Sequence, residues 1–417
     1  MRKTSTGLPS PFIFPSLAVL FCFSMFYRAM NAVIAPDLVK DFQLDPERLG
    51  LLGSAFFYTF AVLQIPMGLL LDRVGPRKVL SLFLLVGAAG TFIFASATTF
   101  HAAFAGMSLI GAGMAPVLVG SLKVFVSRYP RGRFPTLSGS IISIGALGSV
   151  LATSPLVCMI SLIGWRLTLM YSGLFTVVLS AIMFYLLEEG TPEQRKGVAQ
   201  DSRQRQQIGI VKSMQMVVSQ LSFWQIGLLA FFRYGTFVAL QGVWLGPYLM
   251  VAKHFQPIAA GNILVMLSVG SIAGALTAGY LVEKVFRNTK TVLLLGVGCY
   301  ALLLLSLAGI WNIESAAAHA SLFFFLGFFN HFGILVYLHG KELFPAQMSG
   351  TVMAGVNFFL MAGGGFFIQI IGLIISLFVG ASPGDSLGAY HLAFFVCFAG
   401  MAGSLIFYAF SRNAQES

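Results

Sequence analysis

The stretch GLLLDRVGPRK at residues 68–78 guides the interpretation of the whole chain, because a long apolar run ends there in a short, strongly charged turn. A weaker copy, GYLVEKVFR, occupies residues 279–287. Glu283 follows Asp72 by 211 residues, and Pro247 follows Pro36 by the same interval. We therefore expect two related halves with the same order of apolar segments, as in transporters built from internal repeats.

The composition indicates a protein that crosses the membrane many times. Apolar residues make up 57% of the 417 residues and charged residues only 9%, whereas about 25% of a soluble domain is charged. This excludes a secreted disulfide scaffold, a disordered chain and a typical cytosolic enzyme. The net charge of +11 is spread over short clusters between apolar runs. A nucleic-acid partner would need a basic stripe, so we expect a lipid bilayer and no nucleic acid.

Twelve apolar windows are long enough to cross a membrane as helices, which takes about 20 residues each. We predict an all-α membrane protein of twelve transmembrane helices in two pseudo-symmetric six-helix bundles, over residues 1–187 and 222–417. A cytoplasmic linker loop at 188–221 would join them. The windows are 13–36, 48–71, 78–98, 102–126, 135–163, 167–187, 222–249, 258–282, 290–310, 316–340, 349–378 and 388–410.

The distribution of Lys and Arg predicts the orientation, since cytoplasmic loops are enriched in these residues. With a cytoplasmic N-terminus, 18 of them fall on the cytoplasmic side and four outside. The other three, Arg28, Lys123 and Arg233, lie within spans. We therefore expect both termini in the cytoplasm and the protein in the plasma membrane, the inner membrane of a bacterium.

The charged turn at 68–78 resembles the signature loop of the major facilitator superfamily, and the resemblance covers essentially the whole chain. It implies the major facilitator fold, with alternating access between the two halves. It also implies that Asp72, Arg73, Arg77 and Glu283 form a gating latch between the halves, a role that the affinity of helix N-termini for carboxylates supports. The alternative is a solvated charged loop that only marks topology.

A second resemblance is narrower. Tyr27-Arg28 with Asn31 and Pro36, and the runs SAFFY at 54–58 and QIP at 64–66, are similar to the anion:cation symporter branch. That branch and the organophosphate:phosphate antiporters carry an Arg eight residues before a Pro in the first span, as Arg28 is here. Tyr27 stands where many symporters have an acidic residue, and Arg233 lies fourteen residues before Pro247 instead of eight.

Arg28 is the main candidate for binding a substrate. A buried Arg in a membrane costs about 2.5–3.5 kcal/mol on insertion scales and usually faces a cavity with a partner. All 14 acidic residues lie in loops or at span ends, so a substrate anion is an obvious counter-ion for its bidentate fork. The alternative is a structural Arg held by carbonyls or by the rings of Phe26 and Tyr27.

Other polar residues at similar depth could join the site or simply bond between helices. His331 is a candidate for proton coupling, because histidine titrates near neutral pH, but it could equally be a packing residue. The predicted substrate-binding set is Arg28, Asn31, Tyr58, Arg233, Tyr234, Gln241, Asn330, His331 and Asn357.

The sequence thus favours a monomeric secondary active or facilitative transporter of a small organic anion, either a carboxylate or a phosphate ester. Motifs of nucleophilic, metal or P-loop chemistry are absent from the sequence, so we expect no enzyme, no cofactor and no metal. Two alternatives remain open: proton-coupled efflux of hydrophobic or cationic compounds, which would need a carboxylate in the cavity, and a transporter-like ligand sensor.

Overall fold

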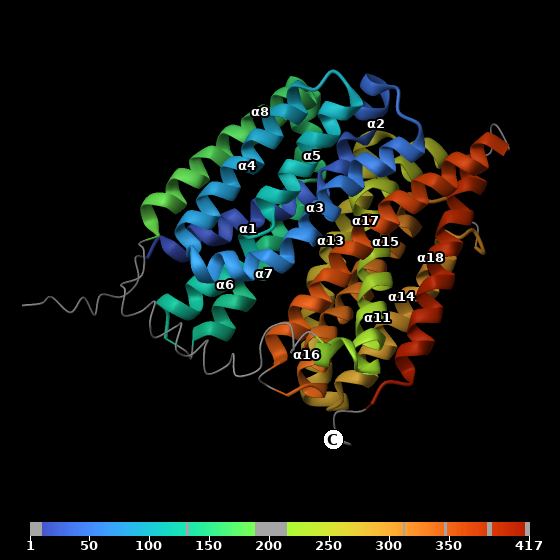
Figure 1. Cartoon of the computed structure of the whole chain (residues 1–417). Helices are drawn as coiled ribbons and strands as arrows, with labels where there is room; N and C mark the ends of the chain where they lie inside the picture. The colour runs from blue at the N-terminus through green and yellow to red at the C-terminus, as the bar shows by residue number, and fades with distance from the viewer. Residues whose placement is uncertain are drawn as a thin grey trace, which may run out of the picture.

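A computed structural model describes residues 11–130, 133–187, 215–311, 313–345, 348–381 and 386–412, and all the regular secondary structure within these ranges is helical. Figure 1 shows the helices as long rods in two groups. The first group contains α1 (Ile13–Ala29), α2 (Asn31–Phe42), α3 (Pro46–Arg73), α4 (Pro76–Ser96), α5 (Phe100–Met114), α6 (Val117–Arg128), α7 (Phe134–Leu151) and α8 (Ser154–Leu186). The second contains α11 (Leu221–Ala239), α12 (Leu245–Pro247), α13 (Pro257–Tyr280), α14 (Thr289–Leu307), α15 (Ala316–His331), α16 (Leu335–Leu343), α17 (Ser349–Ala381) and α18 (Ser386–Ala409).

The helices match the apolar windows of the sequence. In the described part of the chain, nine continuous helical stretches are long and apolar enough to cross a membrane, and the bent pair α1–α2 makes a tenth. Helices α3 and α7 occupy the two remaining windows. The prediction of an all-helical, multi-pass membrane protein is confirmed, and the predicted linker falls mostly on residues 188–214, outside the described ranges.

Gly164 separates the fifth and sixth windows inside α8. Its φ of 76° lies in the left-handed region, which glycine adopts at little cost because it lacks a Cβ. The part of α8 before Gly164 lies in the fifth window, and the part after it, from Trp165, contains the sixth. One glycine therefore makes the turn between two spans.

Two spans that reach the centre of the molecule depart from regular α-helix. The first span breaks at Met30, where α1 and α2 meet at 44°. The seventh contains two π-helical turns, η2 (Leu240–Trp244) and η3 (Tyr248–Ala252), on either side of α12. Such turns in membrane helices occur frequently at functional sites.

The two halves pack against each other mainly through α3 on α17, α2 and α1 on η2, and α13 on α7 and α8. The contacts are close at the ends away from the termini. A Cβ on Gly246 would lie 2.5 Å from the carbonyl oxygen of Ala32, and Ser154 Oγ donates to Asn262 Oδ1 at 3.2 Å. These approaches fix the halves to each other on this side.

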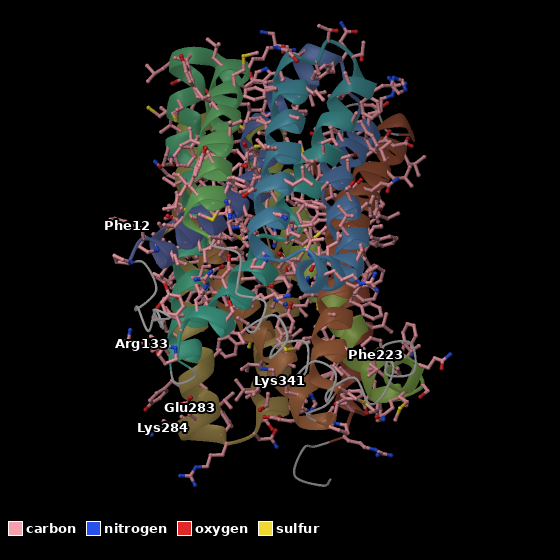
Figure 2. All side chains as sticks on the ribbon, turned by 60° about the vertical axis from the view of Figure 1, so that its left-hand side comes forward. Phe12, Arg133, Phe223, Glu283, Lys284 and Lys341 are labelled. Carbon is pink, nitrogen blue, oxygen red and sulfur yellow. The ribbon has the colours of Figure 1, made fainter. Side chains whose placement is uncertain are left out.

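Two glycines in the copies of the charged motif have open space beside them. Gly68 and Gly279 occupy equivalent places in the two copies of the charged motif, and a Cβ on either would meet nothing within 4 Å. Figure 2 shows Arg133, Glu283, Lys284 and Lys341 toward the lower end of the molecule, the end at which α16 is labelled in Figure 1.

Candidate functional site

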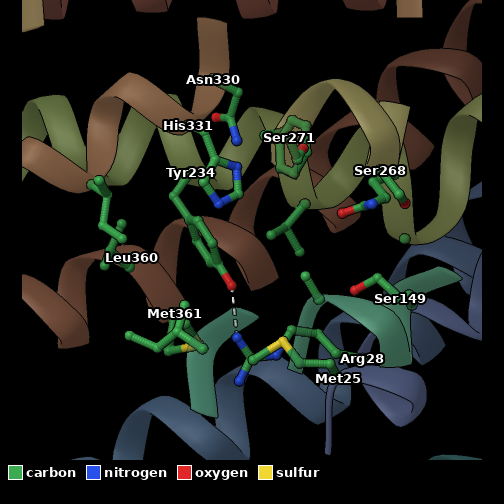
Figure 3. Close-up of a pocket in the computed structure, with 18 of the residues that line it drawn as sticks. Met25, Arg28, Ser149, Tyr234, Ser268, Ser271, Asn330, His331, Leu360 and Met361 are labelled. Carbon is green, nitrogen blue, oxygen red and sulfur yellow. Dashed lines mark hydrogen bonds between the residues drawn. The ribbon is translucent and has the colours of Figure 1, made fainter. Parts of the chain in front are cut away.

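A cavity of about 240 Å³ lies between the two halves. It is lined from one half by α1, α6 and α7 and from the other by α11, η2, α13, α15, α16 and α17 (Figure 3). None of its lining residues is acidic, and two are arginines. The lining residues are Phe21, Met25, Arg28, Ala29, Leu118, Ile142, Ala146, Ser149, Arg233, Tyr234, Phe237, Val238, Gln241, Gly242, Ser268, Ser271, Asn330, His331, Ile334, Tyr337, Asn357, Leu360 and Met361.

Arg28 projects into this cavity from the end of α1, two residues before the break at Met30. Its Nη1 donates a 2.7 Å hydrogen bond to the hydroxyl of Tyr234, across the boundary between the halves (Figure 3). Its guanidinium carbon lies 4.9 Å from the centre of the Phe60 ring. The structural alternative named the rings of Phe26 and Tyr27 as the partners of Arg28. In the structure the ring that contacts its guanidinium is that of Phe60.

The environment of Arg28 leaves its charge without a counter-ion in the described part of the chain. Ion pairs between described residues include those of Arg48 with Asp45 and of Arg166 with Asp41, and none of those given there involves Arg28. Arg28 Nε is buried without a hydrogen-bond partner, and an unmet buried donor of this kind costs about 1–3 kcal/mol. A phosphate or carboxylate oxygen would satisfy it.

Arg233 lies on α11 beside Tyr234 and is only 5% exposed. Its Nη1 donates to the backbone oxygen of Asn330 at 3.0 Å and to its side-chain oxygen at 3.1 Å. Gly333 makes room for it, because a Cβ at that position would collide with the Arg233 side chain. Arg233 therefore reaches the same cavity as Arg28 despite its different spacing to Pro247, and its Nε is likewise buried without a hydrogen-bond partner.

His331 and Gln241 also line the cavity, from α15 and η2. His331 Nδ1 is buried and has no hydrogen-bond partner. In Figure 3 its ring lies near Tyr234, on the same side of the cavity as Asn330. These side chains add neutral polar groups around the two guanidinium groups.

Asn357 lines the cavity but already uses both ends of its amide. Its Nδ2 donates to Gln64 Oε1 at 2.9 Å, and its Oδ1 accepts from the Tyr337 hydroxyl at 3.0 Å. Gln64 belongs to α3 and donates in turn to the Ala115 carbonyl at 3.2 Å. Asn357 thus bridges the two halves at one wall of the cavity.

Two residues of the predicted binding set are absent from the cavity lining. Asn31 is 4% exposed and its Nδ2 faces the sulfur of Met107 at 3.9 Å. The hydroxyl of Tyr58 donates to Gln369 Oε1 at 2.7 Å, between α3 and α17. In this structure both bond between helices, which was the alternative considered for each polar residue of this kind.

The structure describes the side chains of three of the four predicted latch residues. The guanidinium carbon of Arg77 lies 4.3 Å from the Phe184 ring centre, within the first half. Arg73 is exposed at the end of α3, and Glu283 lies in the π-helical turn η4 (Leu281–Phe286). The side chain of Asp72 lies outside what the structure describes.

Several lining residues did not figure among the predicted site residues. Tyr337 approaches from α16, and Ser149, Ser268 and Ser271 come from α7 and α13. Ser268 Oγ is buried and without a partner. Serine is common in membrane helix packing, so their sequence positions alone carry no signal for a cavity.

Comparison with known proteins agrees with this architecture. The sequence profile described as "Major Facilitator Superfamily" matches residues 17–368. The "Probable hexose phosphate transport protein" of Chlamydia muridarum is 22% identical over 388 residues, which is 85% of this chain and 82% of that protein. The "Membrane sensor protein UhpC" of Escherichia coli is 24% identical over 372 residues, 83% of this chain and 82% of that protein.

A solved structure shares the fold. It is a bacterial homolog to the human lysosomal transporter Spinster in an inward-facing and occupied conformation, with a TM-score of 0.76, 15% identity and 96% of each chain covered. The expectation of the major facilitator fold, based on the charged motif and the twelve windows, is confirmed. This chain belongs to the Major Facilitator Superfamily of membrane transporters.

Proposed function

We propose that this protein is a secondary active or facilitative transporter of a small organic anion, a carboxylate or a phosphate ester. The observation that carries the proposal is the cavity between the halves, which contains Arg28 and Arg233 and no acidic lining residue. Guanidinium groups match carboxylate and phosphate geometry through paired hydrogen bonds. In this account, Arg28 binds the anionic group and Arg233 holds a second positive charge close by.

The same cavity disfavours export of organic cations. A cationic compound needs a carboxylate or an aromatic cage, and two fixed positive charges would repel it. The name of the Chlamydia muridarum relative, a hexose phosphate transport protein, supports an anion as substrate.

For the membrane arrangement we propose cytoplasmic termini in a bacterial inner membrane, a monomer, and two six-helix bundles joined by the linker at 188–221. The 18-to-4 distribution of basic residues supports the orientation. The latch role of Asp72, Arg73, Arg77 and Glu283 also remains a proposal, supported by their place in the family motif.

The test is transport by the full chain reconstituted in lipid vesicles. Glucose 6-phosphate and gluconate are compared with glucose, a neutral sugar that lacks the anionic group. We expect uptake or exchange of at least one anion and none of glucose, and loss of that flux in Arg28→Ala. Transport of glucose alone, or an unchanged flux in Arg28→Ala, would refute the proposal.

The coupling of transport is a separate question, for which His331 is the candidate. Its buried Nδ1 has no partner, and histidine is the side chain whose charge changes most readily near neutral pH. If an imposed pH gradient drives anion uptake, we expect His331→Gln to lose that drive while keeping exchange of anion for anion. Gradient-driven uptake that is unchanged in His331→Gln would assign the coupling elsewhere.

A ligand sensor is the second candidate, favoured by the similarity to the membrane sensor protein UhpC. A sensor would bind the anion without moving it. The same vesicles distinguish the two functions, because a transporter shows flux at anion concentrations that saturate binding, whereas a sensor shows saturable binding and no flux.

A further inference from the structure

The hydrogen bond between Arg28 and Tyr234 points to a role for Tyr234 that its neighbour Arg233 does not share. We propose that Tyr234 is a positioning residue, which holds Nη1 of the Arg28 guanidinium so that the Nε and Nη2 donors stay available to an anion. This inference rests on the proposed function, because it concerns how the same cavity recognises its anion.

The planar guanidinium of Arg28 presents different donors on its two sides. The group is planar and carries its five N–H donors in a fixed fork. Nη1 is the nitrogen on the same side as Cδ, and it donates to the Tyr234 hydroxyl at 2.7 Å. The edge formed by Nε and Nη2 points the other way and can take both oxygens of a carboxylate or phosphate at once.

The Nε donor of Arg28 has no hydrogen-bond partner in the empty protein. Nε is the one buried polar atom of Arg28 that lacks a partner. The bond to Tyr234 occupies Nη1, so an anion that binds the Nε and Nη2 edge does not have to displace the hydroxyl. The guanidinium carbon lies 4.9 Å from the centre of the Phe60 ring. Among the described residues, the Nε donor therefore remains available for an anion.

Arg28 and Tyr234 belong to different halves of the molecule. Arg28 lies on α1 in the first half, and Tyr234 lies on α11 in the second. The guanidinium is thus oriented only when the halves are placed as in this structure. A preorganised group binds more tightly because less orientational freedom is lost on binding, so the state shown here should bind the anion better than one in which the halves separate at this level.

The experiment measures binding of inorganic phosphate to the purified full chain in detergent, by titration calorimetry. Tyr234→Phe keeps the ring and removes only the hydroxyl. We expect it to weaken phosphate binding roughly five- to tenfold. The matched control is Tyr300→Phe, which removes another buried hydroxyl bonded to α11, at 3.1 Å from Thr236. This control should leave affinity unchanged, and both variants should melt close to the parent.

A second arm tests orientation directly. Arg28→Lys replaces the fork by a compact ammonium group, which has no edge to orient. Adding Tyr234→Phe to Arg28→Lys should therefore cause no further loss of phosphate affinity, so the two effects are not additive. An equal loss in both backgrounds would show that Tyr234 acts independently of Arg28 and would overturn the inference.

Two further outcomes separate this inference from the proposed function. Tighter phosphate binding by Tyr234→Phe would show that the hydroxyl competes with the anion, and only the positioning role would fall. If Arg28→Ala binds phosphate as tightly as the parent, Arg28 does not form the anion site. Both the positioning role of Tyr234 and the proposed function would then be wrong.

Discussion

Arg166 and Arg28 lie in the same half of the molecule and are held in opposite ways. Arg166 donates from Nη1 to the carbonyls of Ala95 and Ala97 at 2.9 and 2.7 Å, and from Nη2 to Asp41 at 3.1 Å. Arg28 has one neutral hydroxyl and one ring for partners, and its Nε is unpaired. Arg166, whose side chain is 36% exposed, is neutralised by Asp41, whereas Arg28 lines the cavity and has no counter-ion in the part of the chain that the structure describes.

The difference separates a structural cation from one that awaits a ligand. The Arg166 cluster ties the end of α2 to α8, and the indole of Trp165 also donates to Asp41 at 3.1 Å. The hydrogen bonds and the charge of Arg166 are therefore met by protein groups, without a ligand. The positive charge of Arg28 has no counter-ion among the described residues of the empty protein. We infer that the substrate supplies the negative charge.

The largest effect is expected at Arg28 itself. Arg28→Lys keeps the positive charge but loses the planar fork, so the protein should insert and fold while its anion affinity falls roughly tenfold or more. Binding of inorganic phosphate to the purified variant measures this. Affinity equal to the parent's would mean that Arg28 provides only positive charge, and that its planar fork does not take part in binding the anion.

An intermediate effect is expected at Asp72, whose proposed role concerns movement and not binding. Asp72→Asn removes a carboxylate that the family motif assigns to the latch, which should slow cycling several-fold, about the effect of a contact worth 1 kcal/mol. Transport rate and phosphate affinity are compared on the same preparation. A loss confined to affinity would place Asp72 with the binding residues and contradict the latch.

The smallest effect is expected at Phe60. Phe60→Leu keeps an apolar side chain but removes the ring that lies against the Arg28 guanidinium, a contact worth about 0.5–1 kcal/mol. We expect phosphate affinity to change about two- to fivefold, without loss of transport. A loss as large as that of Arg28→Lys would show that the ring, and not the fork, decides recognition.

Much of the fold could be predicted from the sequence because span length and charge are local properties. The windows 135–163 and 167–187 are separated in the structure by the turn at Gly164. The break at Met30 and the π-helical turns after Ala239 had no local signal. They lie where α1, α2 and η2 pack against one another, and such packing across 200 residues of sequence is not encoded in a single window.

The candidate site was predictable in residue type but not in contacts. Depth along each span identified Arg28, Arg233, Tyr234 and His331, and all four line the cavity. Depth alone could not tell that Asn31 faces Met107 instead. The direction of a side chain around its helix depends on neighbours from other spans, which only the structure supplies.

The most direct test of the account compares Arg28→Ala with Arg166→Ala, measuring melting temperature and phosphate affinity on the same preparations. We predict that Arg28→Ala loses phosphate binding but melts at or above the parent, because an incompletely paired buried charge has been removed. Arg166→Ala should melt lower, since it leaves the Ala95 and Ala97 carbonyls without this donor and Asp41 without its counter-ion, and it should bind phosphate normally. The reverse pattern, with Arg28→Ala unstable but fully competent to bind, would make Arg28 a structural residue and contradict an anion site between the halves.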